Sequence, residues 1–246
     1  MYNLVDVLKE DIKSVAFIME NDFNLRAGHL NDFIDIHIGK AKEFFYPLLL
    51  LSSYRLFAKG KKPPYYMAAV IQFIYMANRT HKYKGNSPQY PVLIGDYLYT
   101  KFFSYLCEYD SLKWLKSISE VICSTHEGGM ERSQNVGAVT KLDLKTLEKE
   151  AAFLSKISCE IGASFAKESE NVVDSMKDVG YNIGLAWALS RENATPNEVK
   201  YYFRKAQIKL NSISKNVSNR EMFSAFENLI YEITKIVPEK ACSQVI

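Results

Sequence analysis

Apolar residues recur at the spacing of an α-helix along almost the whole chain of 246 residues. No stretch alternates apolar and polar residues over the length of a β-strand. The segment that follows Pro63-Pro64, residues 65–79, is apolar on nearly every side, and a helix without a polar face has to be buried by its neighbours. The sequence therefore predicts an all-α fold in which this segment is central.

The same periodicity divides the chain into helices separated by prolines, glycines and polar residues. We expect helices over residues 4–19, 65–79, 92–108, 111–125 and 171–189, a long one from near Leu144 and another from Pro196. Asn219 is a suitable N-terminal cap for the last helix, and His126-Glu127-Gly128-Gly129 is expected to end the helix over 111–125. The composition shows no linker, which favours one domain over residues 1–246.

The balance of charge is slight, with 31 basic and 28 acidic residues and a formal net charge of +3. The basic residues are scattered rather than gathered in one stripe, so we expect no nucleic-acid partner. The longest apolar runs fall far short of the roughly 20 residues that span a bilayer. The N-terminus mixes charged with apolar residues, unlike a signal peptide. We therefore expect a cytoplasmic protein without a transmembrane segment.

The cysteines lie far apart in the sequence, at Cys107, Cys123, Cys159 and Cys242. There is no C-x-x-C pair, and the four histidines do not supply the ligands that a structural zinc site would still need. We expect reduced thiols in an intracellular protein and no bound metal.

Four segments occur in an order that carries a further signal. They are the helix Gln72–Asn86 with His81 near its end, the segment Pro91–Leu98 with Gly95-Asp96, the helix start Lys145-Thr146-Leu147, and the segment Gly180–Thr195. Together they resemble the trans-isoprenyl diphosphate synthase (polyprenyl synthetase) family, from about residue 40 to the end, while residues 1–38 match less clearly. The resemblance implies a single-domain helical bundle around a deep central cavity. In active members, two aspartate-rich motifs face each other at its mouth and hold magnesium ions against an allylic diphosphate.

This chain departs from the family at both acidic motifs. The first motif is matched by His81, Lys82, Tyr83 and Asn86, and the second by Arg191, Glu192 and Thr195. Only Glu192 offers an ionised oxygen, which is the ligand that magnesium prefers. A lysine about 4 Å from a divalent ion would cost on the order of 8 kcal/mol at an effective dielectric constant near 20. We therefore expect no catalytic residues and no magnesium.

The resemblance also marks candidate diphosphate-binding residues, namely Lys145, Thr146, Lys82 and Arg191. The simpler interpretation of Lys145-Thr146 is a solvated lysine next to a capping threonine. His81 is interpreted as a hydrogen-bonded residue at a helix end, and Asp96 as a capping or pairing residue. Two other acidic groups have simple interpretations. The segment Asn31–Asp35 is interpreted as a loop with a cap, and the set Glu170, Asp174 and Asp178 as a solvated helix face.

Three functions stay open at this point. The first is a non-catalytic subunit that forms a heterodimer with a catalytic polyprenyl diphosphate synthase subunit, because the family includes two-component enzymes in which one shorter partner has lost both motifs. The contact would use the helices Tyr65–Ala77 and Val92–Tyr105, and a homodimer is an alternative. The second is a protein that binds a prenyl diphosphate without metal, or an enzyme of altered chemistry. The third is a helical interaction protein that uses the fold only as a scaffold.

Overall fold

The computed structural model describes residues 4–24, 44–58, 60–81, 89–134, 143–192 and 194–235. All regular structure in these ranges is helical, which confirms the all-α prediction. The elements are α1 (Leu4–Val7), α2 (Lys9–Asn24), α4 (Phe45–Phe57), α5 (Tyr65–His81), α6 (Gln89–Glu108), the 3₁₀ helix η1 (Leu112–Trp114), α7 (Leu115–Gln134), α8 (Leu144–Leu147), the π-helical turn η2 (Glu148–Ala152), α9 (Phe153–Phe165), α10 (Glu170–Arg191), α11 (Pro196–Ser212) and α12 (Arg220–Lys235). The central cavity implied by the resemblance stays a prediction.

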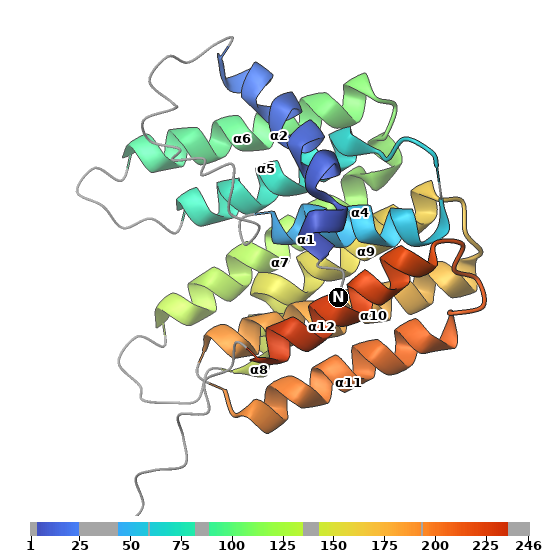
Figure 1. Cartoon of the computed structure of the whole chain (residues 1–246). Helices are drawn as coiled ribbons and strands as arrows, with labels where there is room; N and C mark the ends of the chain where they lie inside the picture. The colour runs from blue at the N-terminus through green and yellow to red at the C-terminus, as the bar shows by residue number, and fades with distance from the viewer. Residues whose placement is uncertain are drawn as a thin grey trace, which may run out of the picture.

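Six helices pack side by side in the order α6, α5, α4, α9, α10 and α11. The N-terminal helix α2 packs on α5, α12 packs on α11, α1 and α4, and α7 packs on η2 and α9. Figure 1 shows the consequence for the outer surface: α6 and α11 lie at opposite edges of the bundle.

The helices α4, α9 and α10 approach one another closely because glycines lie at their contacts. A Cβ atom at Gly162 would lie 2.3 Å from the carbonyl oxygen of Leu50, and one at Gly180 would lie 2.5 Å from that of Ser155. Both distances are too short for a real side chain, so only glycine allows this packing. Every residue of α4 except Arg55 is buried as a result.

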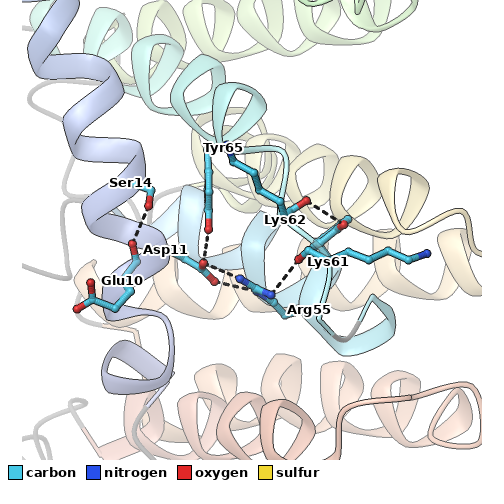
Figure 2. Close-up of polar contacts among 8 residues, drawn as sticks. Glu10, Asp11, Ser14, Arg55, Lys61, Lys62 and Tyr65 are labelled. Carbon is cyan, nitrogen blue, oxygen red and sulfur yellow. Dashed lines mark hydrogen bonds and ion pairs between the residues drawn. The ribbon is translucent and has the colours of Figure 1, made fainter.

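A buried carboxylate holds α2 against α4 and α5 (Figure 2). Asp11 accepts hydrogen bonds from Arg55 Nε at 2.9 Å, Arg55 Nη2 at 2.8 Å and the hydroxyl of Tyr65 at 2.7 Å. Arg55 Nη1 donates to the carbonyl oxygen of Lys61 at 3.0 Å, which also ties down the segment before α5. The hydrogen bonds to Asp11 raise the pKa of Arg55 above its ordinary value, although burial opposes this.

Most of the predicted helices are confirmed, with boundaries shifted by a few residues. The helices from Tyr65, Leu144 and Pro196 begin where the sequence places them, and Asn219 caps α12 by accepting a hydrogen bond from the backbone N–H of Met222 at 3.1 Å. The helix expected over 4–19 is divided into α1 and α2, and the helix from Leu144 contains the turn η2. Among the described helices, none combines the length and apolarity needed to cross a bilayer.

The expected break at His126–Gly129 is wrong, because α7 runs without interruption from Leu115 to Gln134. Gly128 is buried in the contact between α7 and η2, where a Cβ atom would lie 2.9 Å from the Cβ atom of Lys149. The glycine is thus needed for the close approach of two helical segments. This packing overcomes the poor helix propensity of the Gly-Gly pair.

Candidate functional site

The three residues at the second acidic motif lie at and just after the end of α10. The guanidinium carbon of Arg191 stacks 4.7 Å from the ring centre of Trp187, one turn earlier on the same helix. Thr195 begins α11 as its N-terminal cap: its side chain accepts from the backbone N–H of Glu198, whose carboxylate accepts from Thr195 N at 2.9 Å. Two of the three positions that match metal ligands in the family therefore contribute to local structure here.

The third position, Glu192, is paired with an arginine that the sequence did not single out. Arg132 Nη1 on α7 lies 2.8 Å from Glu192 Oε1, and Arg132 Nη2 lies 2.6 Å from Glu150 Oε2 on η2. Burial disfavours the charged form of Arg132, but its hydrogen bonds to Glu150 and Glu192 outweigh that effect and raise its pKa. The only acidic residue of the second motif is thus part of a carboxylate–arginine–carboxylate network that joins α7, η2 and the end of α10.

A second ion-pair group continues along α7 and η2. Lys149 Nζ lies 2.6 Å from Glu131 Oε1 and 3.2 Å from Glu127 Oε2. The buried Thr146 donates its hydroxyl hydrogen to Glu131 at 3.4 Å, whereas its neighbour Lys145 is exposed. Within the described residues, each cation that lies between these helices has carboxylate partners from the same chain. We refer to these pairs, together with Arg132, Glu150 and Glu192, as the α7–η2 network.

The candidate diphosphate residues do not converge in the described part of the chain. Lys145 is exposed at the start of α8, where its backbone N–H donates to the capping carboxylate of Asp143 at 3.2 Å. Thr146 faces α7, and Arg191 stacks on Trp187. Lys82, the fourth candidate, lies outside the described residues.

At the first acidic motif, only His81 falls within the described ranges, because Lys82, Tyr83 and Asn86 lie outside them. His81 ends α5, and its ring packs so closely on α6 that a Cβ atom at Gly95 would lie 2.2 Å from His81 Nε2. Asp96 Oδ1 is 3.5 Å from the same nitrogen. Among the described residues, His81 Nε2 has no hydrogen-bond partner. Asp96 thus lies beside His81, and the hydrogen bond expected for His81 stays a prediction.

A tyrosine beside His81 joins three helices through its hydroxyl group. Tyr99 OH on α6 donates to Asn78 Oδ1 on α5 and lies 2.7 Å from His126 Nε2 on α7. Burial, with a smaller contribution from Asp96, raises the pKa of Tyr99, so the phenol stays protonated. The sequence offered no signal for this group, because its members lie far apart along the chain.

An aromatic cluster lies between α5 and α10, the two helices that lead into the acidic motifs in the family. Phe45 stacks on Trp187 with ring centres 4.5 Å apart, and Tyr46 contacts both Trp187 at 6.0 Å and Tyr75 of α5 at 5.1 Å. Tyr46 is only 2% exposed, and its burial raises the pKa of its hydroxyl group. Both ends of the cluster carry an arginine, since Arg79 lies 5.8 Å from the ring centre of Tyr75 and Arg191 covers Trp187.

A family model described as polyprenyl synthetase matches residues 79–190, which include α6–α9 and nearly all of α10. This part of the chain is therefore similar to the polyprenyl synthetase family. The matched range begins at the end of α5 and stops one residue before Arg191, so it includes His81 and the whole α7–η2 network except Glu192.

Solved structures of polyprenyl synthetases share this fold over nearly the whole chain. The polyprenyl synthase from Caulobacter crescentus CB15, in complex with calcium and isoprenyl diphosphate, aligns with a TM-score of 0.82 at 17% identity, over 96% of this chain and 98% of that one. For the decaprenyl diphosphate synthase from Rhodobacter capsulatus, the TM-score is 0.79 at 16% identity, with the same two coverages. The heptaprenyl diphosphate synthase from Staphylococcus aureus gives 0.76 at 14% identity, over 94% of this chain and 99% of that one. A comparison with curated proteins gave no match.

Within the described residues, no group of three or more His, Cys, Asp or Glu side chains is arranged to hold a metal ion. The set Glu170, Asp174 and Asp178 agrees with this, because Asp174 pairs with Lys177 at 3.0 Å and Asp178 with Lys209 at 2.8 Å. The segment Asn31–Asp35 lies outside the described residues.

Proposed function

We propose that this chain is the non-catalytic subunit of a two-component polyprenyl diphosphate synthase and that it binds no magnesium at its second acidic motif. The proposal rests on the residues found at that motif and on their contacts. Arg191 places a cation at a position where the family has a ligand, and Glu192 is bound to Arg132 at 2.8 Å. When the substrate ionises, the leaving diphosphate has to be neutralised by divalent ions, and these residues supply no such ions.

The partner in this proposal is a homologous subunit that carries both aspartate-rich motifs. It would perform the ionisation, and this chain would complete the dimer and limit the space for the growing prenyl chain. Of the two helices expected to form the contact, α5 is unsuitable, because ten of its residues are buried within this chain. The helix α6 is suitable, because it lies at one edge of the bundle and exposes Leu93 by 65%, Phe103 by 47% and Val92 by 43%.

The first test is synthesis from an allylic diphosphate and isopentenyl diphosphate with magnesium present. We expect no product from the purified chain alone, and a change in activity or product length when the homologous subunit is added. Formation of a prenyl product by this chain alone would refute the proposal. So would a mixture in which both rate and product length equal those of the partner alone.

The second test asks whether α6 forms the contact between the two subunits. L93E puts a charge at the most exposed of the three apolar residues named on α6 and should abolish co-purification of the two subunits. I208E is the matched control, since Ile208 is equally exposed, at 67%, but lies on α11 at the opposite edge. Equal loss of binding in both variants would show that α6 is not the contact.

A second candidate is a prenyl-diphosphate-binding protein that needs no metal. The observation that favours it is the pair Arg79 and Arg191, which cover the two ends of the aromatic cluster and have no carboxylate partner among the described residues. Arginine binds phosphate groups through several parallel hydrogen bonds. Farnesyl diphosphate should then raise the melting temperature equally with and without EDTA, and R191Q should remove the shift while the exposed control K116Q keeps it. A shift that disappears with EDTA would count against this candidate.

A further inference from the structure

The helix α11 exposes two large apolar side chains at the edge of the bundle opposite α6. Tyr201 is 53% and Ile208 67% exposed. With 3.6 residues per turn, both lie on the side of α11 opposite its buried residues, which are Val199, Phe203, Ala206 and Leu210. These two side chains therefore form the centre of the outward face of α11. The helix itself lies at the lower edge of the bundle in Figure 1.

Basic side chains flank this apolar centre on both sides. Lys200 and Arg204 lie along one side of the outward face, and Lys205 and Lys209 lie along the other, as the same helical spacing requires. We refer to these four residues with Tyr201 and Ile208 as the α11 face. The α11 face differs from an ordinary solvated helix surface, because the residues that point most directly outward are apolar and the charged residues lie on either side of them.

The expectation that basic residues are scattered is wrong for this part of the chain. Residues 199–220 contain six basic residues and no acidic residue. The whole chain has 31 basic and 28 acidic residues, so the remainder has 25 and 28 and is negative by three. The only acid of α11 is Glu198, which is bound in the capping box at the start of the helix. The helix α11 and the turn that follows thus carry a local excess of positive charge.

Most of this positive charge is available to a partner. Lys209 is paired with Asp178 of α10 at 2.8 Å, but Lys200, Arg204 and Lys205 have no carboxylate partner among the described residues. Lys205 Nζ lies 4.6 Å from the ring centre of Tyr201, so the ammonium group is held next to the apolar centre. Four buried residues and the capping box fix α11 on the bundle, so the face is already formed before any partner binds.

We propose that the α11 face docks on the surface of a bilayer that contains anionic lipids. A surface-lying helix of this kind places its apolar line among the headgroups and the acyl boundary, with Lys and Arg beside it. Their long aliphatic stems allow the charged ends to reach the lipid phosphates. Ile208 is the residue that argues for lipid rather than nucleic acid, because a phosphate backbone offers no apolar surface for an exposed isoleucine to cover. The proposal goes beyond the proposed function and does not depend on it, since the two surfaces lie at opposite edges.

The test is co-sedimentation of the full chain with vesicles of phosphatidylcholine, with and without phosphatidylglycerol at about one lipid in three. We expect binding only to the anionic vesicles, and weaker binding at higher salt because salt screens the charges. Each basic residue near an anionic surface contributes roughly fivefold to partitioning. The triple variant K200Q/R204Q/K205Q should therefore bind about 100-fold more weakly, and I208Q about tenfold more weakly through loss of apolar burial.

The matched control is K9Q/K116Q/K156Q, which removes the same net charge from exposed positions on α2, α7 and α9. It should bind the anionic vesicles like the unmodified chain. Circular dichroism would verify that all variants keep their helical content. Equal loss of binding in the control and α11 variants would overturn the proposal, because net charge alone would then explain the attraction. Binding to neutral vesicles as strong as to anionic ones, or binding to single-stranded RNA as tight as to vesicles and equally weakened by K200Q/R204Q/K205Q, would also overturn it.

Discussion

Replacing Arg132 with methionine should destabilise the protein mainly through one of its two carboxylate partners. The side chain of Glu150 is only 8% exposed, and it loses its guanidinium partner in this variant. Breaking a buried ion pair from one side costs about 3–5 kcal/mol, because the remaining charge stays buried without compensation. The side chain of Arg132 is itself 33% exposed, so we expect a loss of about 3 kcal/mol, at the lower end of that range.

Glu192, the more exposed carboxylate partner of Arg132, should contribute much less to the stability of the protein. The side chain of Glu192 is 32% exposed and keeps its hydration when the arginine is gone. Ion pairs of this exposure contribute about 1 kcal/mol or less. The variant E192Q should therefore lower the melting temperature by no more than roughly 4 °C, and R132M by roughly 6–12 °C, given about 2–4 °C per kcal/mol at this chain length.

The double variant R132M/E150Q identifies the cause of the loss. A neutral glutamine removes the buried charge that has lost its guanidinium partner, and replacing both members of a buried pair costs far less than removing one. The double variant should therefore be more stable than R132M alone, as measured by urea unfolding with the same m-value. If it is equally unstable, the loss comes from packing of the arginine stem and the electrostatic reasoning is wrong. The reasoning also fails if E192Q is as destabilising as R132M.

Three further outcomes follow from contacts elsewhere in the bundle. D11A removes the carboxylate that binds the guanidinium group of Arg55 and should lower the free energy of unfolding, measured in urea, by about 3 kcal/mol. The control E10A changes an exposed neighbour on the same helix and should lower it by less than about 0.5 kcal/mol. G180A places a Cβ atom 2.5 Å from a backbone oxygen of α9 and should lower the free energy of unfolding by about 1–3 kcal/mol. Burial raises the pKa of the Cys159 thiol, so iodoacetamide followed by peptide mass spectrometry should label the exposed Cys107 in the native protein and Cys159 only after unfolding.

The sequence predicted the class of fold and the positions of most helices because both depend on local periodicity. The spacing of apolar residues in 65–79 and 171–189 was sufficient to place α5 and α10, and Pro196 and Asn219 marked helix starts that the structure confirms. The Gly-Gly pair was misjudged for a different reason. Its role is set by the close approach of η2 to α7, and a contact between segments about 20 residues apart leaves no local pattern.

The candidate site was predictable only in part. The family resemblance directed attention to Arg191, Glu192 and Thr195, which lie at the end of α10 and at the start of α11. It gave no indication of Arg132, which determines what Glu192 can bind. An arginine near the end of a helix is an ordinary surface residue in any sequence, and only the packing of α7 against η2 shows that it lies between two carboxylates.

The three residues that match the second motif share one feature, which is that each has a role inside this chain. Arg191 covers an indole ring, Glu192 completes an ion-pair network and Thr195 starts the next helix. Aspartates clustered at a helix end repel one another unless a cation lies between them, whereas Glu192 and Arg191 are attracted to groups of this chain. If the proposed function is right, this end of the scaffold can keep the arrangement of helices seen in the solved structures with its stability independent of a bound metal.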